Sequence, residues 1–292
     1  MANLEITRAK RLDVYVQERL PGVSRAFAAE IIKTGQVLVN DGQVKSGYKI
    51  KHGDMIDINY VLPEVTAHDY VDMPIIYEDD HCIVINKPIG VLTHSKGAFN
   101  PEGTVASFIA NKVAEHPDWK GQVITTNART GIVHRLDRAT SGVIICAKNP
   151  PAMVWLQSQF SSRKVKKTYY AVIEGTLEMP EAIIDLPIER NPKAPAMFRV
   201  GANGKAAVTQ YKVMATGGNR SLIRLTPTTG RTHQLRVHLK HLGHPIIGDP
   251  FYGGAPNERM LLHAETLELT LPNRERKVFT AALSPEFTVD ET

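Results

Sequence analysis

Hydrophobic residues in the first sixty positions recur first at helical spacing and then at strand spacing. Leu12, Val16 and Leu20 lie about one turn apart, and Pro21-Gly22 ends that run. A second helical stretch starts after Ser24, a favourable N-cap, and a later Asn-Asp-Gly triplet predicts the turn of a β-hairpin. The predicted order is helix, helix, hairpin and strand, over residues 12–20, 24–34, 36–45 and 55–58.

From residue 74 to about residue 286, short apolar runs with strand character dominate the chain. They occupy residues 82–85, 143–147, 169–173, 208–214 and 221–226. Helical stripes over residues 153–160 and 235–242 interleave with them. Strands and helices do not alternate strictly, and no phosphate-binding loop occurs. The pattern therefore predicts an α+β domain with a mixed, mainly antiparallel sheet rather than a doubly wound one.

Residues 60–73 form an acidic, proline-containing stretch without a clear hydrophobic period, which is typical of a linker. A length of 292 residues suits two domains. We therefore predict a small helix-helix-hairpin domain at residues 1–60, a linker at 61–73 and a larger domain at 74–292.

Composition narrows the class of protein. No apolar run approaches the roughly 18 residues that a membrane helix needs, and the first ten residues lack the apolar core of a secretory signal. Two cysteines, Cys82 and Cys146, exclude a disulfide scaffold and a cysteine zinc site and favour a reducing cytoplasm. No exposed heptad pattern is evident, so we predict a monomer.

Charge is distributed unevenly along a chain whose net charge is only +5. Residues 190–248 contain no Asp or Glu but ten Lys or Arg residues: Arg190, Lys193, Arg199, Lys205, Lys212, Arg220, Arg224, Arg231, Arg236 and Lys240. A folded segment with this imbalance indicates that it binds a polyanion, and nucleic acid is the commonest such partner. The short basic run at 163–167, taken by itself, is more typical of a solvated surface than of a binding site.

Three segments carry polar side chains that could perform chemistry. GIVHRLDRATSG at 131–142 crowds them at the entrance of an apolar strand, where a capped turn stabilised by Asp137 is the simpler interpretation. In KKTYYAVIEG at 166–175, strand alternation places Tyr169, Ala171 and Ile173 on one face, where a tyrosine could belong to the core or stack on a base. In the third segment, at 226–253, we expect a helix with Arg231 in its first turn.

The histidines at 238, 241 and 244 in the third segment could suggest a metal site. Their spacing drifts around a helix, and no carboxylate or thiol is near in sequence until Asp249. We therefore predict no metal.

The first domain resembles the S4 RNA-binding domain. The strings RLDVYV, SRAFAAEIIKTGQVLVNDGQVK and then GD match it over about fifty residues with fixed gaps. In that family the second helix and the turn after it present basic residues to structured RNA. The matching positions, expected to bind RNA, are Arg11, Ser24, Arg25, Lys33 and Lys45.

The larger domain resembles the RluA-type pseudouridine synthases. HRLD at 134–137, KTY at 167–169 and GRTHQLRVHL at 230–239 match the family motifs in family order. NKPIGVLTH at 86–94, LGHPIIGDPFYG at 242–253 and LLHA at 261–264 agree with it. One departure is Arg138-Ala139, where many members have a basic and then an acidic residue; this peripheral position puts little in doubt.

The resemblance implies an RNA-modifying isomerase that needs no cofactor, with the fold of that family. It implies that Asp137 is the catalytic carboxylate, that Arg231 forms an ion pair with it, and that Tyr169 stacks on the uracil and could help to deprotonate C5. Arg135 matches a position that inserts into the RNA as the target base flips out. The basic residues of the core expected to contact RNA are Arg135, Arg138, Lys167 and Arg236.

An S4 domain followed by this core is the layout of the members that modify large-subunit ribosomal RNA, which makes that RNA the expected partner. Transfer RNA, or specificity for both RNAs, is the alternative. Two other classes compete with a synthase: a non-catalytic RNA-binding or ribosome-assembly factor, and a glycosylase that uses an aspartate and releases free uracil. The presence of aspartate, tyrosine and arginine at the motif positions disfavours the non-catalytic factor.

Overall fold

The strand-like runs of the larger domain pair into one sheet of nine strands in the computed structural model, which describes residues 10–20, 23, 25–60, 71–94, 102–113 and 130–289. The strands are β3 (Ile75–Glu78), β4 (Cys82–Lys87), β5 (Ser141–Ala147), β6 (Lys166–Glu174), β7 (Glu181–Asp185), β10 (Val208–Gly217), β11 (Arg220–Pro227), β12 (Leu262–Thr270) and β13 (Arg276–Thr280). Their order is β3-β4-β5-β12-β6-β11-β10-β7, with β13 paired to β12. Neighbouring strands are antiparallel except β5 and β12, which run parallel. The predicted α+β class with a mixed, mainly antiparallel sheet is confirmed.

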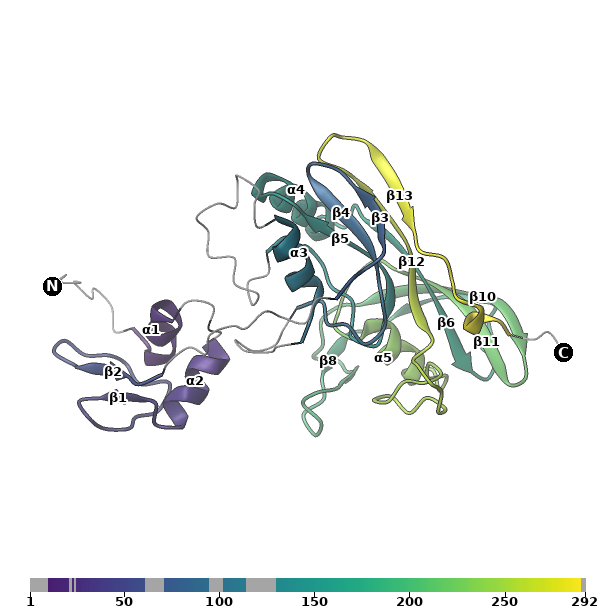
Figure 1. Ribbon diagram of the computed structural model, residues 1–292. Helices are drawn as coiled ribbons and strands as arrows, with labels where there is room; N and C mark the ends of the chain where they lie inside the picture. The colour runs from purple at the N-terminus through teal and green to yellow at the C-terminus, as the bar shows by residue number, and fades with distance from the viewer. Residues whose placement is uncertain are drawn as a thin grey trace. The chain divides into compact units, whose positions relative to one another are not determined.

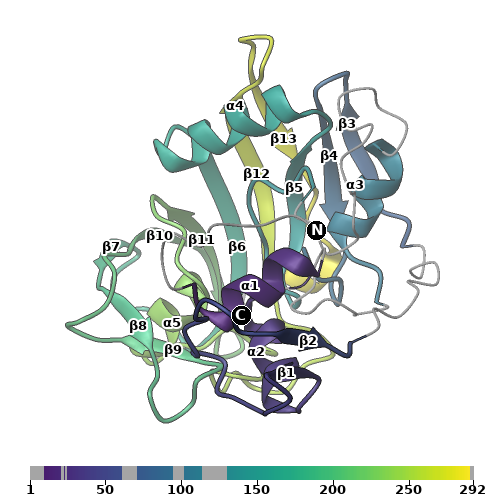
Figure 2. The same cartoon turned by 90° about the vertical axis from the view of Figure 1, so that its left-hand side faces the viewer.

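Two helices, α4 (Pro150–Ser161) and α5 (Gln234–His241), cover different parts of the same face of this sheet (Figure 2). Leu156 of α4 packs in a core cluster with Leu267 of β12, whose direct partner across the sheet is Lys167. Side chains two residues apart on a strand share a face, so Ala171 lies on the same side as Lys167 and packs with α5. The stretch of β6 from Lys167 to Tyr169 therefore faces the space between the two helices.

The opposite face is covered partly by a short 3-10 turn, η2 (Pro285–Phe287). Phe287 packs there with Val172 and Leu261, which point away from the two helices. A small hairpin of β8 (Ile188–Arg190) and β9 (Phe198–Val200) packs against α5, where Ile188 lies in a cluster with Val237 and Tyr252. None of the helices in the described ranges is long and apolar enough to cross a membrane.

The N-terminal elements are α1 (Leu12–Arg19), α2 (Arg25–Lys33), β1 (Val37–Val39) and β2 (Ile56–Ile58), which lie together in Figure 1. The predicted hairpin within 36–45 is wrong in its pairing. The tight turn after Val39 is present, but β1 pairs with β2 instead, in the register Val37↔Ile58 and Val39↔Ile56. Ile56 and Ile58 offer apolar cross-strand neighbours to the two valines, which the polar residues directly after the turn do not.

The chain groups into two compact units that we describe separately. One contains α1, α2, β1, β2 and also α3 (Val105–Val113), and the other contains the nine-stranded sheet with α4 and α5. The division of the sequence into domains at residues 60 and 73 remains a prediction.

Candidate active site

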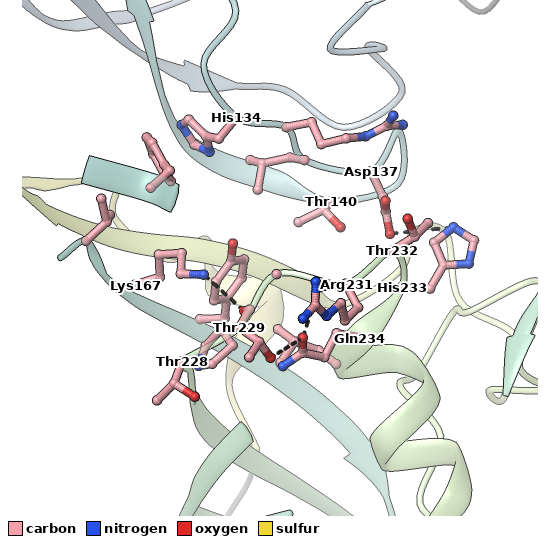
Figure 3. Close-up of a pocket in the computed structure, with 18 of the residues that line it drawn as sticks. His134, Asp137, Thr140, Lys167, Thr228, Thr229, Arg231, Thr232, His233 and Gln234 are labelled. Carbon is pink, nitrogen blue, oxygen red and sulfur yellow. Dashed lines mark hydrogen bonds and ion pairs between the residues drawn. The ribbon is translucent and has the colours of Figure 1, made fainter. Parts of the chain in front are cut away.

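A cavity of about 470 Å³ lies between the C-terminal end of α4 and the N-terminal end of α5, over β6 (Figure 3). This volume is in the range of pockets that hold whole small ligands. Asp137 is the one acidic residue among the described residues that line it. Five basic residues line it as well: Arg135, Arg163, Lys167, Arg231 and Arg236. The pocket therefore combines one carboxylate with an excess of cations.

The loop that carries Asp137 is fixed on both sides of that residue. The Thr93 hydroxyl accepts a hydrogen bond from Leu136 N at 3.1 Å and donates one to Leu136 O at 2.8 Å. Gly142, at the start of β5, has a φ of +116°, and a Cβ there would lie 2.1 Å from Ala264 O of β12. Only glycine permits this approach of the two strands. The crowded polar turn is thus a rigid support that presents Asp137 to the pocket (Figure 3).

The guanidinium that forms an ion pair with Asp137 belongs to Arg236. Its Nη1 lies 3.2 Å from Asp137 Oδ2, while Nε and Nη2 donate to both carboxylate oxygens of Asp249 at 2.7 and 2.8 Å. Burial alone would lower the pKa of Arg236, but the hydrogen bonds and charges of the two aspartates raise it above its ordinary value. Arg236 is therefore a permanently charged group clamped between a deep carboxylate and the one that faces the pocket.

This geometry corrects two expectations. Arg231 was expected to form the ion pair with Asp137, but its Nε donates to Ala206 O at 2.9 Å. Arg231 was expected in the first turn of the helix, but the helix begins only at Gln234, because His233 has a left-handed backbone with φ of 57°. Arg236 was expected on an RNA-facing surface, but its side chain is only 3% exposed and lies in the first turn of α5, facing the site.

Two further basic residues, His233 and Lys87, interact electrostatically with Asp137. His233 Nε2 lies 3.8 Å from Asp137 Oδ2, and its Nδ1 lies 2.8 Å from the Tyr252 hydroxyl. Burial lowers the pKa of His233 despite the Asp137 charge, so it is neutral near pH 7. Lys87 is fully buried and donates to Pro88 O at 2.8 Å; burial lowers its pKa to about 7, although the Asp137 charge opposes this.

Tyr169 occupies the predicted face of β6 and lines the pocket. Burial, and to a lesser extent the Asp137 charge, raises the pKa of this phenol well above its usual range. The phenol rather than the phenolate is therefore the form present near neutral pH. This fits a ring that stacks on a base, and it disfavours a role as a base in removing a proton.

The remaining core residues expected to contact RNA are distributed around the pocket. Arg135 lines it and is exposed, and Arg138 is exposed on the same loop. Lys167 lines the pocket from β6 and is partly buried.

In the N-terminal unit, Asp13 organises two of the predicted RNA-binding residues. Arg11 donates to both oxygens of the Asp13 carboxylate, and Arg25 Nε lies 3.0 Å from Asp13 Oδ2. Hydrogen bonds from Arg11 and Arg25 lower the pKa of Asp13 to about 2 against the effect of burial. Lys33 and Lys45 are exposed. Ser24 lies outside the described residues.

The histidines of the third segment take structural partners. His238 Nε2 bonds with Leu186 O at 2.9 Å, and His244 Nδ1 bonds with Glu174 O at 2.8 Å. Within the described ranges, no three His, Cys, Asp or Glu side chains gather as metal ligands would.

Sequence reasoning missed three residues around the carboxylate: Lys87, His233 and Asp249. All three stand inside quoted motif strings, NKPIGVLTH, GRTHQLRVHL and LGHPIIGDPFYG. An acidic residue inside an otherwise apolar and glycine-rich string, as at Asp249, is the signal that could have indicated a buried charge partner.

Comparisons with known proteins agree with this architecture. A family model described as RNA pseudouridylate synthase matches residues 81–241, and the S4 domain model matches residues 10–56. The chain is 38% identical to an uncharacterized RNA pseudouridine synthase of Chlorobaculum parvum, over 94% of this chain and 91% of that protein. It is 36% identical to the ribosomal large subunit pseudouridine synthase D of Escherichia coli, over 90% of this chain and 83% of that protein.

Solved structures give the same result for the fold. Human RNA pseudouridylate synthase domain containing 1 superposes with a TM-score of 0.60 at 27% identity, covering 74% of this chain and 86% of that one. The human domain containing 4 protein gives a TM-score of 0.57 at 25% identity, over 73% of this chain and 90% of that one. The chain therefore belongs to the RNA pseudouridine synthase family, as an RluA-type isomerase with an S4 domain in its N-terminal part.

Proposed function

We propose that this enzyme converts specific uridines of large-subunit ribosomal RNA to pseudouridine, with Asp137 as the catalytic carboxylate. The observation that carries the proposal is the pairing of Asp137, the one acidic residue in the described pocket lining, with the buried guanidinium of Arg236. The choice of RNA is supported by the relatives named ribosomal large subunit pseudouridine synthase D and by the S4 domain.

The reaction breaks the N1–C1′ bond of a uridine and joins C5 of the same uracil to C1′. A carboxylate that attacks the sugar, or that removes a proton from it on a glycal route, must be ionised at the start. A pocket filled by a base excludes water, and this disfavours the ionised form. The 3.2 Å contact between Arg236 Nη1 and Asp137 Oδ2 opposes that effect. Asp249 keeps Arg236 in place by binding its other two nitrogens.

The target uracil must leave its stack in the RNA to reach Asp137. Flipping a base costs a few kcal/mol, which stacking and hydrogen bonds in the pocket recover. Tyr169 supplies the aromatic surface for that stacking, because it lines the pocket as a neutral phenol. Arg135, an exposed residue of the same pocket lining, would fill the gap that the base leaves in the RNA.

The basic segment 190–248 and the N-terminal basic residues would hold the phosphate backbone at two places. Two contacts on one RNA molecule raise affinity through effective concentration, and each phosphate contact adds to the salt dependence of binding.

The test is release of tritium from unmodified large-subunit ribosomal RNA carrying ³H at uracil C5, compared with unmodified transfer RNA labelled in the same way. We expect release from ribosomal RNA without free uracil, and loss of at least about 1,000-fold in rate for Asp137→Asn. Asp80→Asn is the matched control, because that carboxylate is exposed on the turn between β3 and β4.

Each other outcome removes one part of the proposal. Free uracil in the wild-type reaction would identify a glycosylase, and release only from transfer RNA would overturn the choice of RNA. Full activity of Asp137→Asn would remove Asp137 from the chemistry. Intact binding of ribosomal RNA with no release from either RNA would leave a binding factor.

A further inference from the structure

Lys167 is a cation inside the pocket that has no part in the reaction steps proposed above for Asp137 and Tyr169. It stands on β6, two residues before Tyr169 and on the same face. Its ammonium donates one hydrogen bond to Thr229 O at 3.1 Å, and a Cβ on Gly230 would lie 3.9 Å from it. Lys167 is thus held against the backbone of the segment that leads into α5, with further N–H donors available to a ligand.

The charge of Lys167 has no carboxylate partner in the part of the chain that the structure describes. It takes part in none of the ion pairs found there, and Asp137 lies on the other side of the pocket (Figure 3). Burial alone lowers the pKa of Lys167 to about 8. A partly buried ammonium without a counter-ion is unfavourable, which indicates that negative charge from a ligand compensates it during function.

The surroundings of Lys167 suit the flat edge of a base better than a phosphate. His134 is close enough to Lys167 for their charges to interact, and its ring stacks on Phe160 with centroids 4.5 Å apart. Phe160 and Val165 both line the pocket, and Val165 is two residues before Lys167 in the chain. Burial lowers the pKa of His134 to about 3, so that ring is neutral. Phosphates are strongly hydrated and bind at the rim of such pockets, whereas a carbonyl oxygen can be brought into an apolar end.

Strand geometry sets the scale of the site. Residues two apart on a strand are separated by about 6.6 Å, so an aromatic base stacked near Tyr169 has one edge within reach of the Lys167 side chain. Asp137 and Lys167 lie on opposite sides of the pocket (Figure 3). A uracil whose N1–C1′ bond points toward Asp137 would therefore direct the opposite edge of its ring, with its carbonyl oxygen, toward Lys167.

We propose that the Lys167 ammonium binds a carbonyl oxygen of the flipped uracil and stabilises the negative charge that the ring gains when the N1–C1′ bond breaks. This rests on the proposed function. The electron pair of that bond moves into the ring and is shared with its carbonyl oxygens. Asp137 meanwhile binds C1′ or takes the sugar proton. C5 then bonds to C1′ as the bond between Asp137 and C1′ breaks or, on the other route, as Asp137 returns its proton to the sugar. The C5 proton is lost to solvent and N1 gains a proton, so Asp137 ends as a free carboxylate. Lys167 keeps its own proton throughout and acts as a fixed donor.

The first experiment separates the chemical step from RNA binding. Single-turnover tritium release from unmodified large-subunit ribosomal RNA, and binding of the same RNA, are measured for Lys167→Met and Lys167→Arg. Lys166→Met is the matched control, because Lys166 is the neighbouring residue on the other face and pairs with Glu268 at the surface. We expect Lys167→Met to lower the single-turnover rate at least about 100-fold with RNA affinity changed less than about 3-fold, and Lys167→Arg to retain most of the rate.

A second readout is the pH profile. Tyr169 stays neutral, because burial raises its pKa, and Arg163 and Arg231 are the other charged groups on this part of the pocket lining. His134 stays neutral, so Lys167, with a pKa of about 8, is the titrating group at this end of the pocket. The wild-type rate should fall as pH rises above about 8, and this fall should move to higher pH in Lys167→Arg. Lys87, with a pKa of about 7, contributes equally to both proteins.

A third readout is how the effect of Lys167→Met changes when the uracil is made a better leaving group. Fluorine at C5 makes the uracil anion more stable, so a missing stabilising group matters less. Breakage of the N1–C1′ bond of 5-fluorouridine in the RNA, followed as loss of the 5-fluorouridine nucleoside after digestion, should therefore be slowed less by Lys167→Met than conversion of uridine is. A loss of folding alone would slow both equally, and thermal unfolding of each variant checks this directly.

The outcomes decide between the proposals. A wild-type rate in Lys167→Met, or an equal loss in Lys166→Met, overturns the role of Lys167. A loss confined to RNA affinity assigns the ammonium to the phosphate backbone instead. Absence of product from wild-type enzyme contradicts the proposed function itself and is thereby distinguished from failure of this inference.

Discussion

The strongest stability prediction concerns Asp249, which anchors the guanidinium beside Asp137, the proposed catalytic carboxylate. Its side chain is fully buried, and it accepts hydrogen bonds from Arg236 at 2.7 and 2.8 Å and from Phe251 N at 2.9 Å. Asp249→Asn keeps the size of the side chain but removes its charge. Arg236 is then a buried cation with Asp137 as its remaining partner.

Removing one partner of a buried ion pair costs about 3–5 kcal/mol, because the other charge remains desolvated. For a unit of this size, that corresponds to a fall in melting temperature of roughly 10 °C. Urea unfolding and thermal unfolding measure both quantities. We also expect the rate of tritium release to fall, because Arg236 loses the contacts that aim it at Asp137.

A double-mutant cycle tests the reasoning further. Arg236→Met combined with Asp249→Asn leaves no unpaired charge between these two positions, so the double variant should be destabilised by less than the sum of the single variants. Asp185→Asn, an exposed carboxylate on β7, should change stability by less than about 0.5 kcal/mol. A change below about 1 kcal/mol in the free energy of unfolding of Asp249→Asn would refute the proposed role of Asp249 in holding Arg236. Strict additivity of the two substitutions in the cycle would refute it as well.

Three further outcomes follow from particular contacts. Gly142→Ala should destabilise the enzyme by about 3 kcal/mol or more in thermal unfolding, because its Cβ would lie 2.1 Å from Ala264 O; a native melting temperature would contradict the close approach. Asp13→Asn should lower the stability of the N-terminal unit by about 2 kcal/mol at pH 7. The Asp13 pKa is depressed to about 2, so this difference between variant and wild type should shrink as pH falls from about 5 to 2; a constant difference would show that the charge is not involved. Deleting residues 1–60 should weaken RNA binding and reduce its salt dependence while the unfolding transition of the catalytic unit persists, and loss of that transition would overturn the predicted domain boundary.

Local sequence was sufficient for most of the elements. The strands β4, β5, β6, β10 and β11 lie where apolar runs predicted strands, and α4 lies where its stripe predicted a helix. These segments are strongly periodic, and their burial follows directly from which residues are apolar. The motif strings also sufficed to identify the family and to select Asp137 and Tyr169 as site candidates.

Local sequence was not sufficient for contacts that depend on a helix start or a strand partner. Arg231 and Arg236 stand five residues apart in one motif, and the sequence alone favoured the first. The left-handed backbone of His233 delays α5 until Gln234, and this places Arg236 rather than Arg231 toward Asp137.

By itself, then, the sequence determined the α+β class, the family and the carboxylate expected to act. The tertiary structure decided which cation reaches that carboxylate, that Asp249 holds the cation from 13 residues away, and that Lys167 stands in the pocket without a carboxylate partner among the described residues. The physical reason is that hydrophobic period and motif spacing are properties of neighbouring residues. An ion pair depends instead on the position of whole helices and strands, to within about an ångström.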